Sequence, residues 1–195
     1  MSAIQDDNNQ TYQNCLIYLQ IKISHTERNK TMEIERKYTL KKLPENLESY
    51  PCRIIEQAYL NVNPVVRVRR DNDDYYLTYK GSGMMAREEF NLPLNKESYE
   101  HLLEKADGNI ISKKRYVLPI DNPQFADGFI PDANLKLEIE LDVFSAPFAP
   151  LIMAEVEFPS IEMANAFIAP DWFDEDVTLN PEYHNSNMSQ RAMHK

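Results

Sequence analysis

Apolar and polar residues alternate along most of the chain after residue 31. A period of two is typical of β-strands, because successive side chains point to opposite faces of a sheet. At the start of this pattern, Glu33, Glu35 and Lys37 share one face, spaced about 7 Å apart. Ile34 and Tyr38 lie on the other face. Segments with this alternation cover residues 33–38, 53–60, 65–70, 75–80, 86–92, 110–118, 135–144 and 151–158.

Turn residues separate three of these segments. The polar run 71–74 and the loop 81–83, which contains two glycines, are typical of reversals between antiparallel strands. The sequence therefore predicts a three-stranded antiparallel meander over residues 65–92.

Two short helices interrupt the strand pattern. Asn95 is a good helix cap, and the spacing of apolar residues after it predicts a helix through Ala106. Ser160 is predicted to cap a shorter helix that reaches Ile168 and ends before Pro170.

Nearly every predicted strand has one charged face and one apolar face. A half-exposed sheet with a solvated polar side explains any single strand. Taken together, the strands favour a closed barrel with an ionic interior, because long charged residues outnumber Ser, Thr and Gln on these faces. The predicted inward groups are the acids Glu33, Glu35, Glu89, Glu138, Glu140, Asp142, Glu155 and Glu157 and the bases Lys37, Arg67, Arg69, Lys80, Arg87, Lys113 and Arg115.

An ionic interior needs a compensating ligand, because each unpaired buried ion is unfavourable by several kcal/mol. Paired carboxylates suit Mg²⁺ or Mn²⁺, which prefer oxygen ligands. Arg and Lys suit phosphate oxygens. A metal-bound polyphosphate therefore matches both halves of the predicted interior.

Composition and charge narrow the class of protein. The 195 residues, 43% of them hydrophobic, predict one domain over 32–195 preceded by a loosely ordered extension over 1–31. A net charge of −10 argues against nucleic acid as a partner. Cys15 and Cys52 make no disulfide framework, and the apolar run 16–23 is far shorter than the roughly 20 residues that span a bilayer. We therefore expect a cytoplasmic protein without membrane contact.

The charged positions also form a series of motifs, and these resemble a known family. They are Glu33-x-Glu35-x-Lys37, Arg67-x-Arg69, Lys80, Arg87-x-Glu89, Lys113-x-Arg115, Glu140-x-Asp142-x-Phe144 and Glu155-Val156-Glu157, followed by Trp172, Val177-Thr178 and Tyr183-His184-Asn185-Ser186. Together they resemble the CYTH domain, or triphosphate tunnel metalloenzymes, over residues 32–190. This family includes class IV adenylyl cyclases, thiamine triphosphatases and inorganic triphosphatases.

The resemblance implies a mainly β (α+β) fold, an eight-stranded antiparallel closed β-barrel that forms a charged tunnel with covering helices. It also implies roles for the motif residues. Metal ligands would be Glu33, Glu35, Asp142, Glu155 and Glu157. Substrate would contact Lys37, Arg67, Arg69, Lys80, Arg87, Lys113 and Arg115. For the catalytic roles we nominate Lys37, with Glu89 or Glu157 as the proton acceptor. Asn91 departs from the family pattern, where many members carry another glutamate, and Glu138 is an extra acid without an assigned role.

The leading hypothesis is a Mg²⁺- or Mn²⁺-dependent hydrolase of a short linear polyphosphate. Inorganic triphosphate is the expected substrate, because no base-recognition motif is visible. Such phosphoryl transfer depends mostly on positioning and charge neutralisation. An adenylyl cyclase or a thiamine triphosphatase on the same fold remains an alternative, as does a noncatalytic module that binds polyphosphate or a nucleotide. The sequence also leaves a homodimer open.

Overall fold

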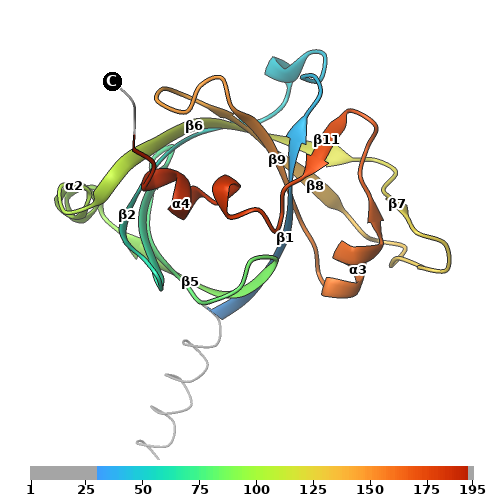
Figure 1. Ribbon diagram of the computed structural model, residues 1–195, viewed down its shortest axis with the longest axis horizontal. Helices are drawn as coiled ribbons and strands as arrows, with labels where there is room; N and C mark the ends of the chain where they lie inside the picture. Colours follow the sequence, from blue (N-terminus) through green and yellow to red (C-terminus); the bar gives the residue numbers. More distant parts are fainter. Residues whose placement is uncertain (1–29, 193–195) are drawn as a thin grey trace, which may run out of the picture.

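The computed structural model describes residues 30–192 (Figure 1). The extension expected over residues 1–31 therefore lies outside the described residues, apart from Lys30 and Thr31, with which the first strand begins. Among residues 30–192, no helix is long and apolar enough to cross a membrane.

Eight antiparallel strands close into a barrel, which confirms the predicted fold class (Figure 1). The strands of this ring are β1 (Lys30–Leu40), β2 (Cys52–Val62), β3 (Val65–Asp71), β4 (Asp74–Lys80), β5 (Ala86–Leu94), β6 (Asp107–Ile120), β8 (Leu137–Phe144) and β9 (Ile152–Glu157). Around the ring the order is β1-β5-β4-β3-β2-β6-β8-β9, and β9 pairs with β1 again.

Strand β1 closes the ring because it has different neighbours along its length. Residues 30–34 pair with β5, and residues 35–39 pair with β9. Outside the ring, β11 (Phe173–Asp176) pairs with the end of β1. The strands β7 (Gln124–Phe125) and β10 (Phe167–Ile168) form a separate two-stranded sheet.

The helices agree with the predicted caps but end earlier. Asn95 accepts a hydrogen bond from Ser98 N at 2.8 Å before α2 (Lys96–Leu103). Ser160 does the same for Met163 N at 3.1 Å before α3 (Ile161–Ala166). The prediction that this second helix reaches Ile168 is wrong, because Phe167 and Ile168 pair with β7 instead.

Three short helical segments were not predicted. They are the 3₁₀ turns η1 (Leu47–Ser49) and η2 (Pro181–Tyr183) and the helix α4 (Asn185–Ser189). In Figure 1, α4 and η2 lie within the outline of the barrel, across one opening of the ring.

Apolar side chains on the outer face of the barrel are buried under a second layer. Ile34 and Tyr38 of β1 pack with Leu141 and Val156, and the α3 and β10 residues Ala164 and Phe167 belong to the same cluster. On another side of the barrel, α2 covers β2 and β3. Figure 1 shows α2 and α3 on different outer sides of the ring. Ile34 and Tyr38 thus face outward, as the alternation predicts.

The inner face changes from apolar to ionic along the strands. At one end of the barrel, inward apolar residues pack against Met188 of α4; they are Tyr59, Val65, Ile111, Phe144 and Met153. We call this the closed end. Two residues further along the same strands the inward residues are ionic, for example Arg67 after Val65 and Glu155 after Met153. Burial of each large apolar side chain contributes about 1.5–3 kcal/mol, which helps offset the buried ions.

Candidate active site

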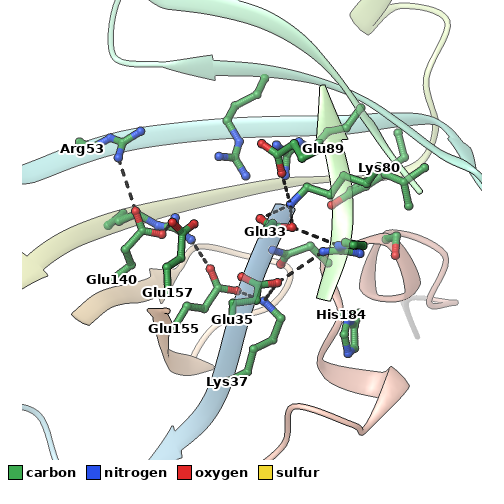
Figure 2. Close-up of a pocket in the computed structure, with 18 residues that line it drawn as sticks. Glu33, Glu35, Lys37, Arg53, Lys80, Glu89, Glu140, Glu155, Glu157 and His184 are labelled. Atoms are coloured by element: carbon green, nitrogen blue, oxygen red, sulfur yellow. Dashed lines mark hydrogen bonds and ion pairs between the residues drawn. The ribbon is translucent and has the colours of Figure 1, made fainter. Parts of the chain in front are cut away.

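A cavity of about 170 Å³ lies inside the barrel, and its wall is mostly charged (Figure 2). Although the chain has a net charge of −10, bases slightly outnumber acids in this wall. The lining acids are Glu33, Glu35, Glu89, Glu140, Glu155 and Glu157, the lining bases are Lys37, Arg53, Arg67, Arg69, Lys80, Arg87 and Arg115, and the remaining lining residues are Tyr59, Val65, His184, Asn185 and Ser186.

Strands β1, β4 and β5 contribute one group of ion pairs. Lys80 Nζ lies 2.6 Å from Glu33 Oε2 and 2.7 Å from Glu89 Oε2. Arg87 Nε lies 3.1 Å from Glu33 Oε2. Burial alone would raise the pKa of Glu89, but Lys80 and Arg67 outweigh it and lower the pKa to about 2. Glu89 is therefore a carboxylate at neutral pH and a poor proton acceptor.

Lys37 forms a second group with carboxylates of β1 and β9. Its Nζ lies 2.8 Å from Glu35 Oε1 and also bonds Glu155. Burial would lower the pKa of Lys37, but Glu155 and Glu35 outweigh it and raise the pKa. Lys37 therefore stays protonated, and its backbone is fixed because its N–H donates to Thr178 Oγ1 at 3.0 Å.

Arg115 connects three carboxylates at the β6–β8–β9 wall. Its Nη2 lies 2.6 Å from Glu155 Oε2 and 2.7 Å from Asp142 Oδ2, and its Nη1 bonds Glu140. Lys113 also bonds Asp142. The structure therefore places Lys113 and Asp142, which we expected to contact phosphate and metal, behind Arg115 rather than in the cavity lining. Their side chains are 0% and 1% exposed.

Arg67 and Arg69 of β3 differ from the other lining bases. Neither makes an ion pair with a carboxylate among the described residues. Arg67 Nη2 donates to Thr78 Oγ1 at 2.9 Å, and its buried Nε has no partner there. Arg69 donates to Gln57 Oε1 from Nε at 3.1 Å and from Nη2 at 2.8 Å. Burial and the neighbouring Arg69 lower the pKa of Arg67. This wall therefore carries two cations that no carboxylate of the described protein contacts directly, although Glu89 attracts Arg67 from a greater distance.

Glu157 of β9 has the opposite environment. It lines the cavity and also an outer hollow with Glu138 and Glu140, and within residues 30–192 no base forms an ion pair with it. Although the residue is open to solvent on one side, partial burial against the wall and repulsion from Glu140 and Glu33 raise its pKa to about 7. Glu157 can therefore exchange a proton near neutral pH.

The acidic wall fits a divalent cation in the type and charge of its oxygen atoms. The carboxylates of Glu33, Glu35 and Glu155 lie near Glu157 closely enough to raise its pKa. A cation would relieve this repulsion. In the described part of the chain, no group of three acidic, His or Cys side chains already forms a cation site. Lys80, Lys37 and Arg115 instead occupy many of the carboxylate oxygens.

Several lining residues were not predicted as site residues. Arg53 was missed because β2 carries Arg53 and Glu56 on opposite faces, so charge alone does not select the inner one. Arg53 Nε donates to Asp71 Oδ1 at 2.9 Å. Tyr59 and Val65 are the uncharged inward residues at the closed end. His184, Asn185 and Ser186 come from the C-terminal segment, where no period of two or of 3.6 marks an inward face; only the family motif points to them.

Comparisons with known proteins agree with this geometry. The CYTH domain model matches residues 31–152. The chain is 34% identical over 161 residues to an inorganic triphosphatase from Nitrosomonas europaea, with 80% of this chain and 96% of that protein covered. An inorganic triphosphatase from Acetivibrio thermocellus is 37% identical over 128 residues, which cover 63% and 70% of the two chains. A crystal structure of an inorganic triphosphatase superposes with a TM-score of 0.57 at 29% identity and covers 82% of this chain and 95% of its own.

Proposed function

The chain belongs to the CYTH domain family, and from this premise we propose that it is a divalent-metal-dependent hydrolase of inorganic triphosphate. Two relatives, which match this chain over 96% and 70% of their own length, are inorganic triphosphatases. The reaction would convert triphosphate and water into pyrophosphate and phosphate inside the barrel.

The observation that supports this proposal best is the positive wall at Arg67 and Arg69, which form no ion pair with a carboxylate among the described residues. Their relative exposures are 4% and 9%, and an unpaired buried ion is unfavourable by several kcal/mol. A phosphate oxygen about 4 Å from a guanidinium would contribute a favourable Coulomb energy on the order of 4 kcal/mol per charge at an effective dielectric near 20. In a chain of net charge −10, such a site supports a small anion as its ligand rather than a nucleic acid.

The lining supports an inorganic chain over a substrate with an organic ring. Nucleobases and similar rings bind to apolar and aromatic surfaces. Among the lining residues, Tyr59, Val65 and His184 offer such a surface. Tyr59 and Val65 also pack in the closed end, and the His184 ring is held by Thr178 O. A chain of phosphates uses the charged groups that make up most of this wall.

A metal ion would be held by oxygen atoms of Glu33, Glu35 and Glu155, and Mg²⁺ or Mn²⁺ suits that donor set. When bound, it would draw negative charge away from the phosphates. Glu157, also expected as a ligand, would instead stay free of the metal so that its carboxyl can take up a proton. Asp142, also expected as a ligand, is less suited, because Arg115 and Lys113 already bond both of its oxygens.

Three kinds of side chain would then do the chemistry. Arg67 and Arg69, together with Lys80, Arg87 and Arg115, would hold the phosphates in place. Lys37, which stays protonated, would stabilise the charge that develops on the transferred phosphoryl group. Glu157 would accept the proton of the attacking water, because burial and neighbouring carboxylates raise its pKa toward the working pH and no base among the described residues forms an ion pair with it.

The test is a substrate panel with the purified full chain. Tripolyphosphate, ATP and thiamine triphosphate are each incubated with Mg²⁺, with Mn²⁺ or with EDTA, and both phosphate and cyclic AMP are measured. We expect phosphate mainly from tripolyphosphate, and only with metal. Cyclic AMP from ATP, faster release from thiamine triphosphate, or binding of tripolyphosphate without turnover would each contradict the proposal.

A further inference from the structure

The C-terminal segment contributes neutral polar groups to an otherwise ionic cavity. Val177 N donates to Lys37 O at 2.9 Å where the segment passes β1. Beyond η2, the residues His184, Asn185 and Ser186 line the cavity. Met188, one turn further, is fully buried against the apolar closed end. Figure 2 shows His184 on the side of Lys37 and Glu35, away from Arg53 and Glu140.

His184 fixes where this segment enters the cavity. The ring is buried, and its Nε2 lies 2.9 Å from the carbonyl oxygen of Thr178. Burial and the nearby Lys37 lower the pKa of His184, so the imidazole is neutral at neutral pH and Nε2 donates its proton to that carbonyl. Because Thr178 also accepts the backbone N–H of Lys37, the residues after His184 are held in a fixed position relative to Lys37.

Asn185 and Ser186 differ from their neighbours in the same short helix. Asn187, outside the cavity, donates to Pro181 O at 2.8 Å, and Ser189 donates to Ser186 O at 2.7 Å. By contrast, the side chains of Asn185 and Ser186 make no hydrogen bond to any described residue, and Asn185 Oδ1 is buried without a partner. Buried polar side chains are nearly always paired in native proteins. The two unpaired side chains are those that face the cavity.

We propose that Asn185 and Ser186 bind the terminal phosphate of the substrate chain. This inference rests on the proposed function and deepens it. The unpaired atom of Asn185 is an oxygen, which cannot bond a phosphate oxygen, so the amide would turn over to present its Nδ2–H to the cavity. That N–H and the Ser186 hydroxyl both donate to phosphate oxygens, and they do so without adding charge next to Lys37. Because α4 packs across the closed end, a phosphate that reaches these residues is the last one of its chain. The substrate class is therefore a short linear polyphosphate with a free end.

The experiment compares Asn185→Ala and Ser186→Ala with Asn187→Ala as the matched control. Loss of one hydrogen bond to a charged group should lower kcat/KM for tripolyphosphate by about tenfold, mostly through KM. Calorimetry should show a similar loss of tripolyphosphate affinity. The control, whose side chain lies outside the cavity, should match the wild type. Cyclic trimetaphosphate, which has no terminal phosphate, should bind the wild type and Asn185→Ala equally.

A further variant separates a phosphate contact from a metal contact. Asn185→Asp keeps the size of the side chain but adds negative charge, so it should weaken tripolyphosphate binding more than Asn185→Ala does. Retained or improved affinity in Asn185→Asp would overturn the inference. Unchanged kinetics in both alanine variants would also overturn the inference. If the wild type still hydrolyses tripolyphosphate in that case, the proposed function would stand. A wild type that neither binds nor hydrolyses tripolyphosphate would refute both.

Discussion

Asp142 holds Arg115 through two parallel hydrogen bonds, from Nε to Oδ1 and from Nη2 to Oδ2, both 2.7 Å long. Such a bidentate pair fixes the plane of the guanidinium as well as its position. The same guanidinium bonds Glu155 and Glu140, so Asp142 orients the group that anchors the acidic wall.

Asp142→Asn should therefore destabilise the fold strongly. The change removes the negative charge that faces both Arg115 and Lys113, and breaking a buried ion pair in this way is unfavourable by about 3–5 kcal/mol. Urea unfolding at neutral pH measures the effect. Glu138→Gln, an exposed acid on the same strand, serves as the control and should change the free energy of unfolding by less than about 0.5 kcal/mol. Equal effects of the two variants would contradict a structural role for Asp142.

The pairing of these ions could not be predicted from the sequence, although their inward direction could. Direction depends only on the alternation within one strand, which is why Glu35, Lys37 and Glu155 were expected inside the barrel. Whether Asp142 meets Arg115 or a metal depends on the register between β6 and β8, which alternation does not contain. The closed end was missed for a similar reason, since Met188 reaches its apolar partners only through the folded ring.

The β10 strand shows the same limit in the outer layer. Phe167 and Ile168 have the spacing of a helix face when read locally. Their pairing with Phe125 and Gln124, about forty positions earlier along the chain, supplies backbone hydrogen bonds that the helix would otherwise provide. Tertiary pairing therefore overrides the local preference here.

Arg67→Met should weaken substrate binding without weakening the fold. Arg67 has no carboxylate partner among the described residues, so its removal leaves no buried anion unpaired, and the free energy of unfolding should not fall. Tripolyphosphate affinity should fall by about 100-fold, because the guanidinium would donate about two hydrogen bonds to a charged ligand.

The control for Arg67→Met is Arg53→Met. Arg53 also lines the cavity but is bonded to Asp71 and its side chain is 37% exposed, so its loss should affect binding less. Calorimetry and thermal unfolding of both variants give the comparison. A large loss of stability in Arg67→Met with unchanged affinity would show that the positive wall is structural.

Removal of residues 1–29 should leave both folding and triphosphate hydrolysis intact. The ring needs β1 only from Lys30, which pairs with Phe90 of β5. Removal of residues 1–34 is the matched control, because it deletes every β1–β5 pair together with Glu33, and it should prevent closure of the barrel. Circular-dichroism melting and phosphate release distinguish the two truncations. Loss of the cooperative melting transition in the shorter deletion would contradict a domain that begins at Lys30.

Hydrolysis should rise with pH, because Glu157 must lose its proton before it can accept one from water. Its carboxyl has a pKa of about 7 instead of 4.5. The midpoint should lie below about 7 in the metal-loaded protein, because the cation relieves the repulsion that raises this pKa. Glu157→Gln should abolish this rise and lower kcat by about 10²–10⁴-fold. Glu138→Gln, which changes an acid in the same outer hollow, should keep the rise. It therefore controls for any pH dependence that comes from ionisation of the substrate.

The raised pKa of Glu157 affects stability in the opposite direction. Between pH 4.5 and about 7 the folded protein binds more protons at Glu157 than the unfolded chain does, so the free energy of unfolding falls as pH rises through this window. Glu157→Gln should remove that fall, and a variant with the wild-type profile in both measurements would exclude Glu157 as the proton acceptor.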